Sequence, residues 1–505
     1  MTTPAEPAVA HRGLITLCVI FATTIQALDA TIANMALPYM QGTLNATIDQ
    51  VAWVLTSYII ATAIMTAPMG WLANRFGRKQ LLTLCLVGFA SFSSMCALAQ
   101  SLEQIVIFRF IQGMFGAGLV PLAQSILLDI YPAEQRGPAM AVWGMGLMIG
   151  PIVGPPIGGL LTDLYHWRLV FVVGVPFCVI AIIGLWVLLP RTTAQAGLRF
   201  DWIGFIILAI GVASFQLMLD RGQSQDWFDS RQILVAAILA GLGMYLFVVH
   251  IVTAQRPFID PALFRDRNFI TATIMLFCFG VVLISSSVIA APWLQTVSNY
   301  PVSQAGWMLA PRGLCSMFGM MLVGRLTGKV DQRALVSTGL LFTAWSLWDM
   351  TSWTPDVDAM WVTTVMGIQG FGLGMTFIPL QVIAFTTLAP GLRTQGSALI
   401  NLFRNIGAAL GVSICAAALV RNGQALHEEI GAHITPFNRA LDLYPSVSRF
   451  LHPDTPRGAA YLDRMVSNEA TIIAYLNDFK LLMVISLLTL LLVPLIRRPA
   501  PGAGT

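Results

Sequence analysis

The stretch LITLCVIFATTIQALDATIANMAL at residues 14–37 is apolar except for a few uncharged polar side chains and a single charged one, Asp29. An α-helix rises about 1.5 Å per residue, so about 20 apolar residues cross a hydrocarbon layer of about 30 Å. The run is also longer than the hydrophobic region of a cleavable signal peptide. It therefore predicts a membrane-spanning helix.

Runs of the same kind continue along the whole chain. Of its 505 residues, 56% are hydrophobic and 10% are charged, whereas a soluble domain usually carries about 25% charged residues. Because lipid cannot satisfy the backbone of an open strand, the runs predict an all-α polytopic membrane protein with fourteen spans. The predicted spans are residues 14–37, 51–72, 80–100, 103–126, 138–161, 168–190, 202–219, 232–253, 270–293, 304–327, 334–350, 360–387, 393–420 and 477–496.

The charged residues indicate how the chain is oriented. The chain has 28 Lys and Arg against 24 Asp and Glu, and its net charge of +4 is too small to indicate a nucleic-acid partner. Lys and Arg gather in alternate short loops, which the positive-inside rule places in the cytoplasm together with both termini. These loop residues are Arg75, Arg78, Lys79, Arg136, Arg191, Arg199, Arg256, Arg265, Arg267, Lys329, Arg333 and Arg393.

The two ends of the chain resemble each other at a nearly constant offset. GWLANRFGRK at 70–79 is echoed by GRLTGKVDQR at 324–333, and QGMFGAG at 112–118 is echoed by QGFGLG at 369–374. Duplicated halves are typical of transporters whose substrate site lies between the halves. The repeat predicts spans in a 6+2+6 arrangement. The predicted parts are tails at 1–13 and 497–505, bundles at 14–190 and 270–496, and two extra helices with their linkers at 191–269.

One predicted connection is much longer than the others. Residues 421–476 are polar and follow a span that ends on the outside, so we predict an external loop. Connections of this length usually have a function or are disordered. Docking of an external partner and a passive extension are both open interpretations.

Asp29 is the residue with the clearest chemical role. An ionised carboxylate near the bilayer centre costs about 2.5–3.5 kcal/mol or more, so it must face water, a partner or a proton. Because desolvation favours the neutral acid, we predict that Asp29 binds a proton. Arg109 stays charged and is its natural counterpart, although a permanent structural pair, or an arginine reaching for the outer interface, is the alternative. We expect substrate contacts from Gln26, Asn34 and Gln112.

Several further motifs occur in a fixed order along the chain. They are the loop at 70–79, LDATIANMALP at 28–38, the Gly/Pro run GPIVGPPIGG at 150–159, and LDRGQSQDWF at 219–228. Together they resemble those of the fourteen-span drug:proton antiporters of the EmrB/QacA type, a family within the major facilitator superfamily. The resemblance covers nearly the whole chain.

The resemblance implies a major facilitator fold and a proton-coupled multidrug efflux antiporter in the bacterial inner membrane. It implies export of amphipathic compounds by alternating access, with Asp29 and Arg109 in proton coupling. A periplasmic adaptor and an outer-membrane channel are the partners that it implies. The family usually has Asp where this chain has Asn74, so an ionic form of the gate lacks that charge. The implied gating residues are Gly70, Asn74, Arg75, Gly77, Arg78, Gly113, Gly150, Pro151, Gly154, Pro155, Gly158 and Gly159.

The Gly/Pro run acts through its shape. Glycine lets helix backbones approach closely, and proline bends the helix axis. We expect a tight, kinked contact near the pseudo-symmetry axis that seals a leak path, and ordinary small-residue packing is the alternative.

Other functions remain as alternatives. The same fold suits a dedicated exporter of an endogenous lipid, siderophore or metabolite. A membrane enzyme or sensor would require clustered catalytic groups at one depth, and the sequence offers no such cluster, no metal-ligand set and no GxxxxGK[ST] nucleotide motif. We therefore predict a transporter without a cofactor or metal, whose 28 Phe, 23 Met and 13 Trp permit a broad range of apolar substrates.

Overall fold

The computed structural model describes residues 11–190, 199–255, 257–434 and 455–497. Helices make up nearly all of these residues, and an isolated bridge between Thr327 and Val330 is the one β-type pairing among them. A helix satisfies its own backbone hydrogen bonds, which is the requirement that a lipid environment sets. The predicted all-α fold class is therefore confirmed.

The first part of the chain forms six spans, three of which have bends or breaks. The helix α2 turns by 58° into the short α3, and α5 and α8 continue into α6 and α9 with brief interruptions. The helices are α1 (Arg12–Leu44), α2 (Ile48–Thr66), α3 (Met69–Phe76), α4 (Arg78–Leu98), α5 (Leu102–Gly116), α6 (Leu119–Ile130), α7 (Ala133–Leu164), α8 (Leu169–Val172) and α9 (Val175–Leu188).

The rest of the chain contributes two additional helices and a second group of six. The additional pair is α10 (Trp202–Arg221) and α11 (Arg231–Thr253). The second group is α12 (Arg267–Pro292), α13 (Val302–Leu326), α14 (Gln332–Met350), α15 (Ala359–Thr386), α16 (Arg393–Ala432) and α19 (Pro456–Leu490). Short helical turns are η1 (Gln223–Gln225), η2 (Trp227–Asp229), η3 (Pro261–Arg265), η4 (Trp293–Val297), η5 (Pro390–Leu392) and η6 (Val493–Leu495).

The number of spans is consistent with the predicted fourteen. Within the described residues, eleven helices are long and apolar enough to cross a membrane, and the bent pair α2–α3 makes a twelfth. The remaining two predicted spans coincide with α13 and α14, which have 25 and 19 residues. These two helices are long enough to span but less apolar, and α13 carries two arginines within its length.

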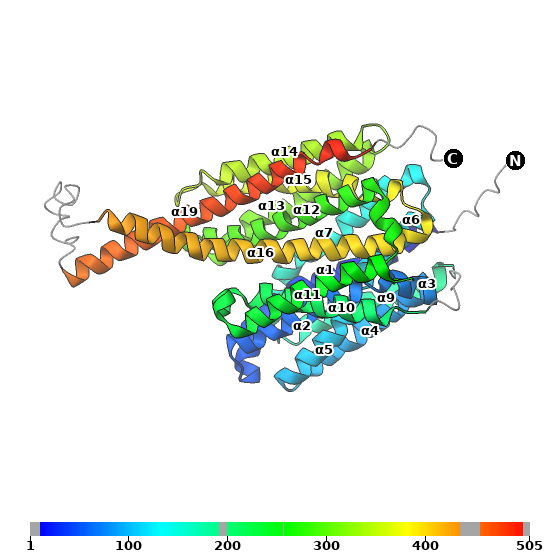
Figure 1. Cartoon of the computed structure of the whole chain (residues 1–505). Helices are drawn as coiled ribbons and strands as arrows, with labels where there is room; N and C mark the ends of the chain where they lie inside the picture. The colour runs from blue at the N-terminus through cyan, green and yellow to red at the C-terminus, as the bar shows by residue number, and fades with distance from the viewer. Residues whose placement is uncertain (1–10, 191–198, 256, 435–454, 498–505) are drawn as a thin grey trace.

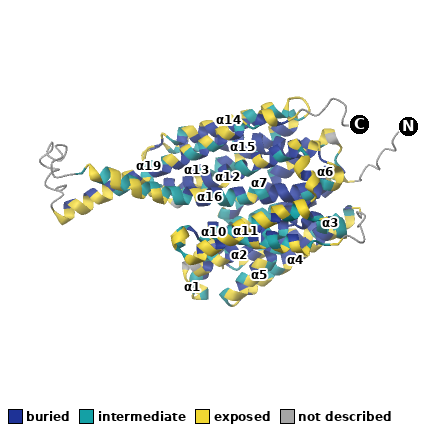
Figure 2. Ribbon diagram, viewed as in Figure 1, coloured by how far each residue is buried: buried dark blue, intermediate teal, exposed yellow. Residues whose placement is uncertain are grey.

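The helices form two bundles that lie side by side, with both ends of the chain at one end of the molecule (Figure 1). We call this end, where Arg12 and Arg497 lie, the terminal end. Buried residues gather along the facing sides of the helices, and exposed residues cover the outside (Figure 2). The pair α10–α11 packs closely because Gly211 and Gly243 lie against each other, and α10 also contacts α2.

The hydrogen bonds that join the two bundles gather toward the terminal end. Gln124 donates to Gln381 at 2.5 Å, and the hydroxyls of Ser125 and Thr394 are 2.7 Å apart. All four side chains are buried. Gln124 and Ser125 lie midway along α6, Gln381 lies near the end of α15, and Thr394 lies in the first turn of α16. The bundles are therefore joined toward the end of the molecule where the chain's ends lie.

Residues 421–476 differ from the predicted long loop. Helix α16 continues to Ala432, and α19 begins at Pro456, so much of the described part is helical. The two helices project together beyond the bundles (Figure 1), and His427 Nε2 lies 3.0 Å from Asp463 Oδ1 across them. Polar composition suggested a loop, but a polar helix is stable where it pairs with another. Residues 435–454 of the predicted loop lie outside the described residues.

Candidate functional site

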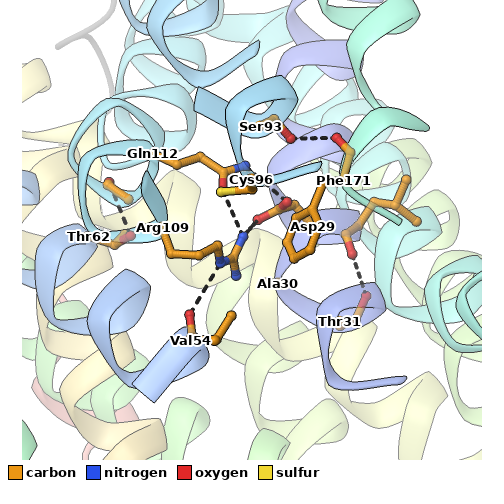
Figure 3. Close-up of polar contacts among 12 residues, drawn as sticks. Asp29, Ala30, Thr31, Val54, Thr62, Ser93, Cys96, Arg109, Gln112 and Phe171 are labelled. Carbon is orange, nitrogen blue, oxygen red and sulfur yellow. Dashed lines mark hydrogen bonds and ion pairs between the residues drawn. The ribbon is translucent and has the colours of Figure 1, made fainter. Parts of the chain in front are cut away.

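Asp29 and Arg109 form a buried ion pair inside the first bundle (Figure 3). Arg109 Nη1 lies 2.6 Å from Asp29 Oδ2, and the side chains of Arg109 and Asp29 are 0% and 6% exposed. Asp29 comes from α1, and Arg109 comes from α5. At this short distance and depth of burial, a negative charge on Asp29 is balanced directly by the guanidinium of Arg109.

Gln112 completes this cluster one helical turn after Arg109. Its Nε2 donates to Asp29 Oδ1 at 3.1 Å, and its Oε1 accepts from Arg109 Nη1 at 2.9 Å. Both carboxylate oxygens of Asp29 therefore accept a hydrogen bond. We predicted that Gln112 contacts substrate, but the structure places it in the charge cluster, where it is fully buried.

Two aromatic rings surround the guanidinium of Arg109. The ring centres of Tyr58 and Phe171 lie 4.3 Å and 5.4 Å from its central carbon, and its Nε donates to the Val54 carbonyl at 3.3 Å. A cation held against aromatic faces gains about 2 kcal/mol when it is desolvated. Sequence reasoning missed these residues, since one tyrosine or phenylalanine among many apolar residues carries no distinctive signal.

The other two predicted substrate residues lie apart from the ion pair. Gln26 is half-buried on α1 and lies beside the Tyr58 hydroxyl. Asn34 is exposed, and its Nδ2 donates to the Ala30 carbonyl of the preceding turn at 3.4 Å. A small pocket next to Asp29 is instead lined by apolar groups of α1, α4 and α8 together with Ser93.

The glycines of the Gly/Pro run pack α7 against α1. A Cβ atom on Gly150 would lie 2.6 Å from the Leu28 backbone nitrogen, one residue before Asp29. Gly154 meets Thr31 in the same way, and Gly158 meets Ile32. This close contact lies within the first bundle. The same run also faces the second bundle, where Ile152 lies against Gly313 of α13, so a contact that seals a leak path near the pseudo-symmetry axis stays a prediction. The glycines themselves fix the helix that carries Asp29.

The remaining members of the predicted motif have different surroundings. A Cβ on Gly159 would meet nothing within 4 Å, so Gly159 has no packing role in this structure. Pro151 and Pro155 lie inside α7. Gly113 on α5 lies against the Tyr58 carbonyl, where a Cβ would come within 2.5 Å. Its lack of a side chain therefore lets α5 approach α2 beside the charge cluster.

The predicted loop at 70–79 consists largely of the short helix α3. Gly77 ends this helix with a φ of 87°, a conformation that favours glycine. Gly70 is helical rather than in a turn, and a Cβ there would lie 2.6 Å from Gln395 Cα. It lets α3 touch α16 of the other bundle. Asn74 and Arg75 lie on α3, Arg75 in its last turn.

An acid on α6 supplies a charge that Asn74 does not. Asp129 forms an ion pair with Arg78, and Arg393 Nη1 lies 3.3 Å from its other oxygen. Arg78 begins α4, and Arg393 begins α16 of the second bundle. We call these three residues the latch. An ionic connection between the bundles therefore exists at the terminal end, although the residue at position 74 is an amide.

Further arginines lie inside the second bundle. Arg312 donates to the Leu283 carbonyl at 2.6 Å and to the hydroxyls of Ser286 and Ser287, so the backbone contact expected for an intramembrane arginine is present. Arg404 lies 5.9 Å from the centre of the Phe377 ring. Among the residues that the structure describes, neither arginine forms an ion pair with a carboxylate.

Comparison with known proteins decides the family. The family model for the Major Facilitator Superfamily matches residues 19–412, which is most of the chain. The chain belongs to the major facilitator superfamily. It is a multi-pass membrane transporter rather than an enzyme, and small molecules are the substrates that this family suggests.

Two curated relatives and one solved structure illustrate the similarity. Multidrug export protein EmrB of Haemophilus influenzae is 33% identical over 97% of this chain and 96% of its own. Fatty acid resistance protein FarB of Neisseria gonorrhoeae is 33% identical over 85% of this chain and 84% of its own. The human organic anion transporter MFSD10 (TETRAN) is 14% identical, covers 95% of this chain and all of its own, and has a TM-score of 0.59. At that identity the likeness concerns the fold alone.

Proposed function

We propose that this transporter is a proton-coupled multidrug efflux antiporter that exports amphipathic compounds by alternating access. The observation that carries the proposal is the buried pair of Asp29 and Arg109, joined at 2.6 Å. The names of relatives such as EmrB supply the substrate class. An acid in this position has two stable states: it is ionised and paired, or it is protonated and released from Arg109.

The coupling follows from those two states. While Asp29 is ionised, its two oxygens tie α1 to Arg109 and Gln112 of α5. Protonation removes the charge that holds Arg109, so the hold of α5 on α1 weakens. Because the glycines of α7 pack directly against α1, a change in α1 reaches α7 as well. Proton binding thereby alters the packing of three helices of the first bundle.

We propose that the terminal end faces the cytoplasm and that the membrane is the bacterial inner membrane. The basic residues of the alternate loops, including the latch residues Arg78 and Arg393, lie at that end, as the positive-inside rule requires. In this orientation the hydrogen bonds and the latch close the cytoplasmic side. The described conformation is then the one in which substrate leaves toward the outside.

The energy of one proton is adequate for drug export. A proton entering down about 100 mV releases about 2.3 kcal/mol, and one pH unit adds about 1.36 kcal/mol. The sum of about 3.7 kcal/mol supports a gradient of a few hundred-fold for a neutral compound, at 1.4 kcal/mol per factor of ten.

The Asp29→Asn variant tests the proposal in proteoliposomes. Under an imposed pH gradient, the wild type is expected to accumulate a fluorescent drug against its own gradient, and the variant is expected to lose this accumulation at least tenfold. Asp356→Asn, in an exposed turn between α14 and α15, is the matched control and is expected to transport normally. Accumulation at the wild-type rate by Asp29→Asn would remove this carboxyl from the mechanism.

We also propose that the projecting parts of α16 and α19 dock a periplasmic adaptor that leads to an outer-membrane channel. Support comes from the length of these helices, which extend past the predicted spans on the side opposite the latch. Replacing residues 425–470 by a short linker is expected to abolish drug resistance in cells but to preserve exchange in proteoliposomes. Full resistance of cells that carry the shortened chain would contradict this assignment.

A second candidate function is dedicated export of an anionic lipid. It is favoured by Arg404, a cation of the second bundle that forms no ion pair with a described carboxylate, and by the name of the relative FarB, a fatty acid resistance protein. A fatty acid carboxylate would provide that charge. Competition between a cationic dye and a fatty acid separates the candidates, because a dedicated lipid exporter leaves the dye unmoved.

A further inference from the structure

The second bundle contains a buried acid whose surroundings differ sharply from those of Asp29. Asp478 lies on α19 and is 1% exposed. Among the described residues, none forms a hydrogen bond with either of its carboxylate oxygens and none forms an ion pair with it. Asp29, by contrast, receives a hydrogen bond on each oxygen and a full positive charge.

The helices around Asp478 carry arginines, Arg404 on α16 among them, but no described cation forms an ion pair with this acid. Helix α19 packs against α12, α14, α16 and η4. The titratable neighbours that interact with Asp478 are Cys415 of α16 and Tyr475 on its own helix, and neither carries a positive charge. The acid of α14, Asp349, accepts hydrogen bonds from two indole nitrogens. Lys480, two residues along, is exposed on another face of α19.

The internal repeat shows that the polar centre of the second bundle is built differently. With the offset of 256 residues between the starts of the first and ninth spans, Asp29 corresponds to Ser285. Ser285 is fully buried, and the described residue beside its hydroxyl is Cys415, through its thiol. With the offset of the QG motif, Arg109 corresponds to Met366. The second bundle therefore has no arginine in the equivalent place and takes its acid from α19.

An isolated ionised carboxylate in such a place is costly, and a buried group of this kind becomes neutral instead. We propose that Asp478 is a second proton-binding site of this transporter and that it holds a proton in the conformation described here. The proton adds to one carboxylate oxygen and no other bond changes. This inference rests on the proposed proton coupling. The two acids are then in opposite states at once, with Asp29 ionised and Asp478 protonated.

The consequence for transport is the number of protons exchanged in each cycle. Asp478 releases its proton in a conformation in which water reaches α19. Asp29 binds a proton in a conformation in which its ion pair with Arg109 is broken. A cycle that uses both acids exchanges two protons for each drug molecule, so the attainable drug gradient is the square of that for one proton.

An infrared experiment tests the protonation without relying on transport. The purified, full-length protein at neutral pH is expected to show the carbonyl stretch of a protonated carboxylic acid, and Asp478→Asn is expected to lose that band. Glu469→Gln, which removes an exposed acid of the same helix, is the matched control and is expected to keep it. If the wild-type spectrum minus the Asp478→Asn spectrum has no such band, the proposal is overturned.

A transport experiment separates this proposal from the proposed function. The reversal potential of drug flux in proteoliposomes is expected to give two protons per drug for the wild type and one for Asp478→Asn. If the wild type exchanges drug without protons, the proposed function itself fails. If the wild type is proton-coupled and Asp478→Asn keeps its stoichiometry, only the assignment of Asp478 fails. Asp478→Glu, which restores a carboxyl, is expected to recover two protons.

Discussion

Replacing Arg109 by methionine removes the cation of the buried pair while keeping most of the side-chain volume. Asp29 would then keep one hydrogen bond, from Gln112 at 3.1 Å, and would lose the charged contact at 2.6 Å. Removing one partner of a buried ion pair costs about 3–5 kcal/mol. At 1.4 kcal/mol per factor of ten, the ratio of ionised to protonated Asp29 falls roughly a hundred- to a few thousand-fold.

The expected phenotype is a transporter that is locked in the protonated state. Accumulation of a neutral dye driven by a pH gradient is expected to fall at least tenfold in Arg109→Met. Exchange of labelled for unlabelled dye, which needs no net proton movement, is expected to persist. Arg404→Met is the control, because it removes a cation of the second bundle that has no described carboxylate partner.

A double variant tests whether Arg109 and Asp29 act as one unit. Because Arg109 and Asp29 act as one unit, Asp29→Asn/Arg109→Met is expected to be no worse than either single variant in driven accumulation, and the free energies of the two changes do not add. Driven accumulation at the wild-type rate in Arg109→Met would refute the view that this guanidinium holds Asp29 in its ionised state.

Four further substitutions test the packing, the latch and the turn at Gly77. Gly150→Ala is expected to lower the free energy of unfolding by about 1–3 kcal/mol, because its Cβ would press on the α1 backbone. Gly159→Ala is the control: its Cβ would lie in open space, so the melting temperature is expected to stay unchanged or to rise. Asp129→Asn weakens the ion pairs of the latch. A loss of about 1–2 kcal/mol would reduce the population that is closed at the terminal end about 5- to 30-fold. Distances between spin labels on the two sides of the latch measure this population, and Asp356→Asn is the control. Gly77→Ala, at a φ of 87°, is expected to cost about 1–3 kcal/mol in thermal unfolding.

The sequence predicted the spans well because the requirement is simple: enough apolar residues to cross a hydrocarbon layer. It was less informative where helices leave that layer. Residues 421–476 contain no apolar run, so the helical ends of α16 and α19 had no recognisable signal. The same limit affected Asp478. It stands at the edge of the predicted span 477–496, where a charge is ordinary, but α19 begins at Pro456 and buries it.

Of the candidate site, the sequence supplied the charges but not their surroundings. Asp29 and Arg109 are conspicuous because each is a charge inside an apolar run, and the structure brings them together. Tyr58 belongs to a different helix and resembles any other aromatic residue in a span. The role of Gly150 was predicted as close packing, yet its partner helix depends on which face of α7 turns toward α1. Contacts between distant segments of this kind follow only from the three-dimensional arrangement.

The continuous helix α16 has a mechanical consequence. Its 40 residues give a rod of about 60 Å, twice the hydrocarbon thickness of about 30 Å, and no proline interrupts it. One tip carries Arg393 of the latch, and the other reaches the His427–Asp463 contact outside the bundles. A tilt imposed on the projecting end of this rigid helix is therefore transmitted as a displacement of the end that carries Arg393. A partner that binds the projecting parts of α16 and α19 can therefore change the position of Arg393 in the latch at the other end of the molecule.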